Sequence, residues 1–213
     1  MVSYLGDENR ILAEIASNAI DNVGPICPCI FCRESYPLFL QQVKADRPTR
    51  LTRLVYDLHN KVSAKLAAQQ WSELQRVHGL AIPFDSVRTY IIKAPTYDTF
   101  LKRLILQDTE PVNGHDVALL IAAFAGRVTA ATQWNFLLFA SSVSVALGVI
   151  QNARLQELSA LLTDACRVYR ANGMSGGKLF ADAYVRFTRT SHEVLEKKLY
   201  LMRAGVCAAG TCV

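Results

Sequence analysis

The sequence predicts an all-α protein. Apolar residues recur with a helical period of about 3.6 over long segments. The clearest apolar stripe is Leu51, Leu54, Val55, Leu58, Val62 and Leu66. Of the 213 residues 51% are hydrophobic, and no low-complexity run is present, so the chain can bury a sizeable core and is not globally disordered. Residues 87–92 are the one segment left undecided between strand and helix.

Helix-start and helix-stop residues divide the first part of the chain into three helices. Asp7 is a candidate N-cap, and the Gly24-Pro25 pair predicts the end of the first helix. Because proline suits the first turn of a helix, Pro28 and Pro48 predict the next two starts. The expected helices are residues 7–21, with Ile11, Leu12, Ile15 and Ile20 on one face, 29–44 and 49–74.

The remainder of the chain is also predicted to be helical. Gly79, Pro83 and Pro95 predict a connector over residues 78–97. The helices expected after it are residues 99–106, 113–150 with a break at Gly126, 153–170 and 178–202. The expected organisation is a domain over residues 1–80, a connector over 81–96, a helical domain over 97–203 and a flexible tail over 204–213.

Charge and hydropathy exclude several classes of protein. The net charge of +5 is scattered, so no nucleic-acid partner is expected, and the small cluster of Lys44, Arg47, Arg50 and Arg53 fits a solvated helix face. The first ten residues predict no secretory signal. Residues 128–150 are the most hydrophobic stretch, but Thr, Ser, Asn and Gln interrupt it, which favours a buried core helix over a membrane span.

The six cysteines are not spaced as a disulfide framework would be. Cys27, Cys29 and Cys32 lie together, which favours a catalytic or metal-binding role over structural cross-links. A C-x-x-C at a helix start is suited to thiol chemistry, because the free backbone N–H groups and the helix dipole favour the thiolate. Pro28 directly before Cys29 fits that placement.

Two other roles are open to these cysteines. A zinc site needs four ligands, and Cys27, Cys29 and Cys32 together with His59 or His78 supply them. The chain would then be a zinc-binding helical interaction module. A thioredoxin-like C-x-x-C needs βαβ surroundings, which a helical segment does not offer.

A second motif provides the C-x-x-C with a cofactor. His59-Asn60-Lys61-Val62-Ser63-Ala64-Lys65-Leu66 has the pattern H-N-x-V-x-x-x-L and lies on the helix expected over residues 49–74. The two motifs in this order resemble the Erv/ALR family of FAD-dependent sulfhydryl oxidases. The resemblance covers residues 7–75 and implies a four-helix-bundle FAD domain, to which a C-terminal helical domain is added, in a homodimer. It also implies an enzyme that forms disulfides in dithiol protein substrates and reduces O₂ to H₂O₂.

The resemblance assigns roles to individual residues. It implies that Cys29 is the outer cysteine, which exchanges with incoming thiols, and that Cys32 lies beside the flavin. His59 and Asn60 would pack against FAD and hydrogen-bond to it, and Lys65 would meet its phosphates. The implied FAD-binding set is His59, Asn60, Val62, Ser63 in place of the family's Asn, Lys65, Leu66 and Trp71, for which plain core packing is the alternative.

The chain departs from the family pattern in three places. The helix leading into the C-x-x-C has no R-x-x-x-x-W-x-x-L-H helix before it, the C-x16-C pair is absent, and Cys27 stands where the family has tyrosine. Residues 133–139 carry a W-x-x-L pattern, with Arg127 upstream. We hypothesise that this C-terminal helix fills the place of the missing one, in cis or from a second subunit, with Trp134 against FAD. An ordinary core helix is the alternative.

The remaining cysteines differ in their surroundings. Cys207 and Cys212 resemble the shuttle pair that family members carry on a flexible arm, and a structural disulfide is the alternative. Cys166 lies in an apolar helix and is expected to be an inert buried thiol. Enlarged oxidases of this type are similar to those of large DNA viruses, which implies a viral protein of the host cytoplasm or nucleus and of the virion. A structural virion protein with a degenerate flavin fold is the last alternative.

Overall fold

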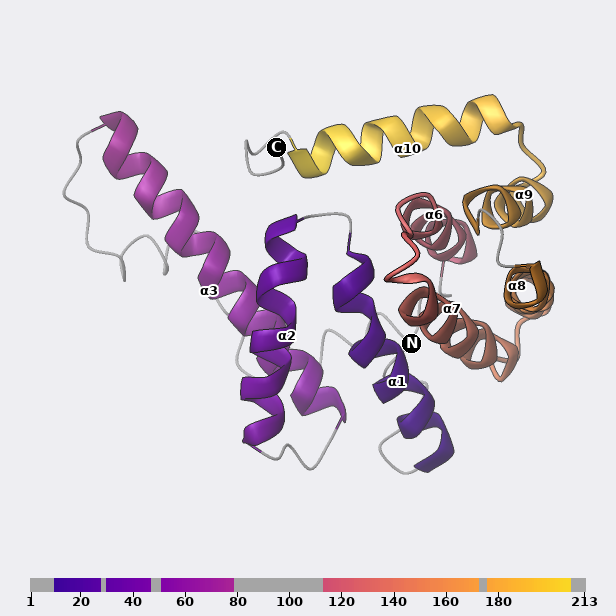
Figure 1. The fold of residues 1–213 in the computed structure, drawn as a ribbon, viewed down its shortest axis with the longest axis horizontal. Helices are drawn as coiled ribbons and strands as arrows, with labels where there is room; N and C mark the ends of the chain where they lie inside the picture. Colours follow the sequence, from indigo (N-terminus) through magenta and orange to yellow (C-terminus); the bar gives the residue numbers. More distant parts are fainter. Residues whose placement is uncertain (1–9, 28–29, 47–50, 79–112, 173–175, 208–213) are drawn as a thin grey trace. The chain divides into compact units, whose positions relative to one another are not determined.

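A computed structural model describes residues 10–27, 30–46, 51–78, 113–172 and 176–207. These residues form eight helices and no strand, so the predicted all-α class is confirmed (Figure 1). The expected connector over 81–96 and the undecided segment 87–92 lie outside the described residues. The helices are α1 Arg10–Ile26, α2 Ile30–Ala45, α3 Leu51–His78, α6 Gly114–Ala125, α7 Gln133–Gly148, α8 Ala153–Asn172, α9 Gly176–Thr188 and α10 His192–Cys207.

The chain divides into two compact units. One combines Met1–Pro37 with Pro111–Val213, and the other is Leu38–Glu110. The expected division assigned residues 1–80 to one domain, whereas in the structure α1 packs against α7, more than a hundred residues further along the chain. In the second unit, Val43 on α2 and Leu54 and Leu58 on α3 are buried.

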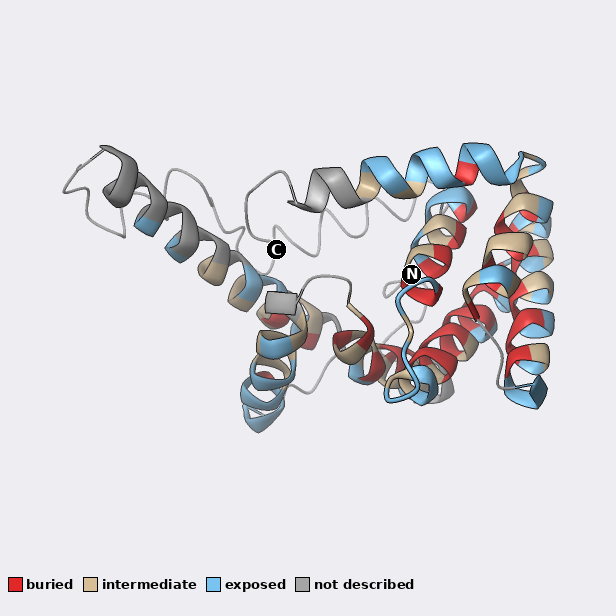
Figure 2. Ribbon diagram, turned by 45° about the horizontal axis from the view of Figure 1, so that its top comes forward, coloured by how far each residue is buried: buried red, intermediate tan, exposed pale blue. Residues whose placement is uncertain are grey.

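The core of the first unit is built around α7. This helix is apolar around most of its circumference, because it packs against α1 on one side and α8 on the other. Phe136 is fully buried, and its ring meets Phe180 of α9 edge-on at a centroid distance of 4.8 Å. Tyr169 of α8 meets the same Phe136 ring at 6.1 Å. Figure 2 shows the buried residues concentrated in the helices of this unit.

The most hydrophobic stretch of the sequence forms this core. Gly126 ends α6 and α7 begins after Thr132, which confirms the predicted break. The Thr132 hydroxyl accepts a hydrogen bond from the Thr129 backbone N–H at 3.0 Å and so stabilises the turn between the helices. Among the described residues no helix is both long and apolar enough to cross a membrane.

The first helix differs from its prediction in two ways. It continues through Gly24 and Pro25 and ends at Ile26. Proline at this position removes only one backbone hydrogen bond, and the helix ends one residue after it. It also buries Ala16, Ala19 and Ile26, whereas Ile15 and Ile20 of the expected stripe are half-buried and the side chains of Ile11 and Leu12 lie outside the described residues. Ala19 belongs to the same buried cluster as the core residues of α7, where a small side chain lets two packed helices approach closely.

The single helix expected over residues 178–202 is wrong, since the structure has two. α9 ends with Arg189 in the left-handed region at φ 56°, and the Thr190 N–H bonds the Val185 carbonyl at 3.3 Å. This is the hydrogen bond of a Schellman ending. The Ser191 hydroxyl then accepts from the Val194 N–H at 3.3 Å and caps α10. The structure continues α10 to Cys207, so residues 204–207 of the expected tail are helical.

Arg189 should be a point where glycine increases stability. A left-handed conformation costs an L-residue about 1–2 kcal/mol, of which glycine recovers part, since its own ordering entropy is larger. We expect Arg189→Gly to raise the free energy of unfolding by about 0.5–1 kcal/mol and Arg189→Val to lower it by about 1 kcal/mol. Urea unfolding followed by circular dichroism checks both. Equal effects of Gly and Val would contradict the assigned turn.

Candidate functional site

The turn that carries the C-x-x-C joins α1 to α2. Cys27 follows the last residue of α1 and is half-buried, and its backbone N–H bonds the Gly24 carbonyl at 3.1 Å. Cys32 lies in the first turn of α2. Cys29 and the side chain of Cys32 lie outside the described residues. The structure thus confirms a helix start at the C-x-x-C, which is the backbone setting that the sequence predicted.

Arg33 fixes this turn from the α2 side. Its Nη1 donates to the Cys27 carbonyl oxygen at 2.9 Å, in a partly buried position. A guanidinium held beside a cysteine-containing turn adds a positive charge, and a nearby positive charge favours the thiolate form of a cysteine. Arg33 was not among the predicted site residues, although a basic residue directly after a C-x-x-C is visible in the sequence.

Tyr36 holds the same two helices together one turn further along. Its hydroxyl donates to the Ile20 carbonyl at 2.8 Å, and its ring lies so close to Gly24 that a Cβ there would be 2.5 Å from Tyr36 Cδ1. Burial raises the pKa of the Tyr36 phenol, and the negative charges of Asp21 and Cys27 raise it further. Gly24, predicted to be a helix breaker, therefore serves as a packing site.

The H-N-x-V motif lies on α3, in the second unit. His59 and Val62 are exposed, and Lys65 is half-buried. The side chains of His59 and Lys65 each interact with a neighbouring group. Asn60 has a buried Oδ1 that has no hydrogen-bond partner among the described residues. A buried polar atom without a partner costs about 1–3 kcal/mol, so this atom points to a ligand that would satisfy it. The side chains of Ser63, Leu66 and Trp71 lie outside the described residues.

FAD fits this part of α3 by the chemistry of its donor set. Asn60 offers a buried acceptor, and an amide side chain suits the N–H groups of a flavin or adenine ring. Lys65, about one turn further along α3, offers a cation for a phosphate. The C-x-x-C turn and this helix belong to different units, and the structure describes each within its own unit.

The helix that carries Trp134 packs against the helix that leads into the C-x-x-C. Asn135 Nδ2 donates to Asn22 Oδ1 at 2.9 Å, and Asn18 Nδ2 donates to Ser142 Oγ at 3.0 Å. This order shows that α1 and α7 run antiparallel, so the beginning of α7 lies at the end of α1. Trp134 is there, with 59% of its surface exposed. The helix belongs to the core, as the alternative of an ordinary core helix expected, but the Trp134 side chain itself is not buried.

The other cysteines have separate environments. Cys166 is buried in α8, and burial raises the pKa of its thiol, which confirms the expectation of a buried thiol. Cys207 is the last residue of α10, and Cys212 lies outside the described residues, so the shuttle pair stays a prediction. Within the described part of the chain no three His, Cys, Asp or Glu residues are arranged to hold a metal ion. Because that part omits Cys29, the zinc alternative is not tested.

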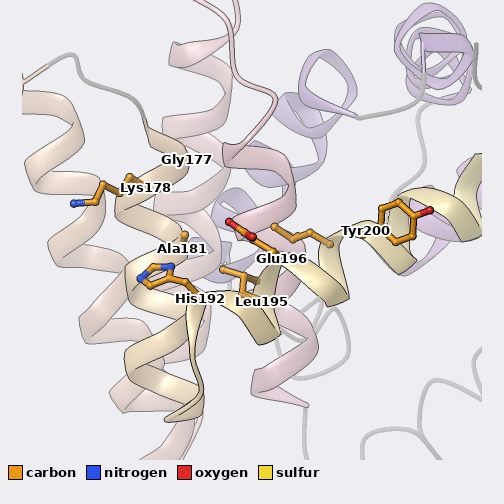
Figure 3. A pocket seen from close by; sticks show the side chains of 8 residues that line it. Gly177, Lys178, Ala181, His192, Leu195, Glu196 and Tyr200 are labelled. Carbon is orange, nitrogen blue, oxygen red and sulfur yellow. The ribbon is translucent and has the colours of Figure 1, made fainter.

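A pocket of about 640 Å³ lies between α9 and α10 (Figure 3). Leu195 and Ala181 give it an apolar floor, and Lys178, Glu196 and His192 stand around it. His192 Nε2 is 3.0 Å from Asp182 Oδ1. Since the lining charges are of both signs and His192 already has a partner, the pocket does not select one class of ligand.

Comparison with known proteins gives no further guide. No family model matches the chain, and no curated protein and no solved structure is similar to it.

The Tyr36 contact should make stability depend on pH. Because the folded phenol has the higher pKa, the folded protein keeps this proton above pH about 10, where the unfolded chain releases it, and stability falls as pH rises. We expect Tyr36→Phe to cost about 1 kcal/mol at pH 7, with the difference from wild type narrowing above pH about 10. Urea unfolding at several pH values measures this.

Tyr200→Phe is the matched control, since Tyr200 is 70% exposed. This variant should follow wild type at every pH. A constant difference between Tyr36→Phe and wild type over the whole pH range would contradict the assigned environment of Tyr36.

Proposed function

We propose that the protein is an FAD-dependent thiol oxidase that forms disulfides in dithiol protein substrates. The observation that carries the proposal is the buried, unpartnered Oδ1 of Asn60, because it lies within the motif that independently resembles a flavin-binding helix. The second support is the C-x-x-C at the start of α2, with Arg33 bonded across the turn.

The proposed reaction begins at the outer cysteine. A substrate thiolate attacks Cys29 Sγ of the Cys29–Cys32 disulfide, and Cys32 leaves as a thiolate. The second substrate thiolate then displaces Cys29, so the substrate leaves as a disulfide and both cysteines are reduced. Two electrons have entered the protein and must leave it before the next turnover. When bound, FAD supplies the acceptor for these electrons and passes them to O₂, which yields H₂O₂.

The residues around the turn would prepare the cysteines for this exchange. Arg33 bonds the Cys27 carbonyl in the turn and Tyr36 bonds the Ile20 carbonyl within α1, and together these bonds hold α2 against α1 on either side of the turn. The free N–H groups and the dipole at the start of α2 would favour the thiolate form of a cysteine in its first turn. A fixed turn also limits the loss of entropy when the mixed disulfide forms.

The C-terminal half would complete the FAD domain, in cis or from a second subunit. α7 packs antiparallel against α1, which is the kind of neighbour that the missing bundle helix would supply. The exposed Trp134 stands at the end of α7 nearest Cys27, and we propose that it covers bound FAD. The Erv-like bundle, the homodimer, the shuttle role of Cys207 and Cys212, and the viral setting belong to the same proposal and follow from the resemblance.

The absorbance spectrum of the purified protein tests the proposal first. We expect a flavin band near 450 nm that bleaches with dithiothreitol and returns in air. In Cys29→Ser and Cys32→Ser the band should remain, but dithiothreitol should no longer drive turnover, since the relay is broken. A colourless protein would overturn the proposal, and zinc analysis would then separate a metal module from a structural helical protein.

Asn60→Leu separates ligand binding from folding. Because leucine removes the unpartnered carbonyl, we expect the apoprotein to be more stable than wild type by about 1 kcal/mol, while flavin content falls at least tenfold. Thermal unfolding and the absorbance ratio at 450 and 280 nm measure the two effects. A less stable apoprotein with normal flavin content would show that Asn60 has a structural partner instead.

Trp134→Ala tests the contribution of α7. The exposed side chain should be removable without loss of the fold, so we expect unchanged unfolding in the apoprotein and several-fold weaker flavin retention. Tyr200→Ala is the control, because it removes an exposed aromatic ring from α10. Normal flavin retention in Trp134→Ala would exclude this residue from the cofactor site.

A further inference from the structure

A second pocket, with a volume of about 430 Å³, lies between α7 and α8. This volume falls within the range of small-molecule sites, which is roughly 300–1,000 Å³. The pocket lies within the first unit and does not include the C-x-x-C turn or the H-N-x-V motif. Its occupant is therefore a separate question from the proposed oxidase activity.

The charge at this pocket is positive. Arg167 and Arg170, one turn apart on α8, both line it, and none of its lining residues is acidic. Arg167 Nη2 is 3.4 Å from Asp164 Oδ1, but both side chains are mostly exposed, so this pair is weak. The Arg170 guanidinium has no carboxylate partner among the described residues. Two guanidinium groups are thus available to an incoming anion.

The hydroxyl groups of the pocket shape its wall. Ser144 Oγ donates to the Ser159 carbonyl at 2.8 Å, so it accepts from Thr163 Oγ1 at 2.7 Å. Ser159 Oγ in turn donates to the Ser144 carbonyl at 2.7 Å. These protons are already used between α7 and α8, and they hold the two helices in register. The charge of a ligand would therefore be met by the arginines.

A thiol lies in the wall of the same pocket. Cys166 is 6% exposed, and Ser141 hydrogen-bonds it from α7. Arg170 is close enough to act electrostatically on this thiol. Any anion held by Arg170 would consequently approach Cys166. The alkylation rate of this cysteine can therefore be used to detect an anion in the pocket.

We propose that this pocket binds a small oxyanion, a carboxylate or phosphate group, through Arg170 and Arg167, with the body of the ligand against Val145. The guanidinium fork matches the two oxygens of either group. The end of α8 carries a partial negative charge of about half a unit, which opposes an anion, but two full positive charges outweigh it. Exposed arginines that form no site would attract anions without saturation, so phosphate or acetate would protect Cys166 no better than sodium chloride at equal ionic strength.

Alkylation of Cys166 tests this directly. Iodoacetate and iodoacetamide deliver the same atoms to sulfur, and they differ in the charge that the reagent carries. The quantity measured is the rate of the iodoacetate reaction at Cys166 divided by that of iodoacetamide, followed by mass spectrometry of the peptide that contains this residue. The exposure of the thiol and its thiolate fraction affect both rates equally, so they do not change this ratio. We expect the ratio to fall about threefold to tenfold in Arg170→Gln, and by a smaller factor in Arg167→Gln. Arg186→Gln, a substitution on the exposed side of α9, should leave it unchanged.

Protection experiments identify the anion. Millimolar inorganic phosphate or acetate should slow the iodoacetamide reaction at Cys166 with a saturable dependence, whereas sodium chloride at equal ionic strength should not. Stronger protection by one of the two shows whether the site takes phosphate or carboxylate. A rate ratio that is insensitive to both arginines, or protection equal to that of sodium chloride, would overturn the proposal. Because the readout needs no flavin, its failure and that of the proposed oxidase activity are distinguishable.

Discussion

The packing of α1 against α7 is the contact on which the first unit depends. Ala19 lies in the buried cluster shared with α7, and polar side chains bond across the contact, with Asn22 accepting from Asn135 and Asn18 donating to Ser142. Amide groups buried between helices fix one register, because any shift would leave them without partners. The beginning of the chain is thereby attached to a core made mostly by its end.

This contact also sets where the C-x-x-C lies. α1 is held by α7, and the turn after α1 is held in turn by Arg33 and Tyr36 from α2. The Arg33 clamp uses the Cys27 carbonyl in the turn, and the Tyr36 clamp uses the Ile20 carbonyl within α1. A turn fixed at both sides is a suitable platform for disulfide exchange, since the reacting sulfur atoms need a defined geometry.

The polar groups of the two proposed sites differ in whether they are already satisfied. The hydroxyls between α7 and α8 bond one another and the backbone, so they contribute to the stability of the first unit. The Asn60 oxygen is buried without a partner, and the arginines above Cys166 lack a buried counter-charge. A stable fold tolerates few buried polar atoms without a partner, which is why we attach a ligand to Asn60, whereas the exposed arginines are solvated and attract an anion by their charge alone.

The sequence by itself determined the helical class, the helix start at the C-x-x-C, the break at Gly126 and the burial of Cys166. These follow from local preferences and from hydrophobic periodicity, which act within a few turns of one helix. Only the tertiary structure decided that α1 joins the C-terminal half, that Gly24 accommodates a tyrosine ring, and that Asn60 lacks a partner. Such facts depend on which residues meet across long separations in the chain, and no local pattern of residues encodes that. The division of the last helix at Arg189 could have been predicted in part from the sequence. The four polar residues from Thr188 to Ser191 indicate a break, but the apolar periodicity on either side of them favoured one continuous helix.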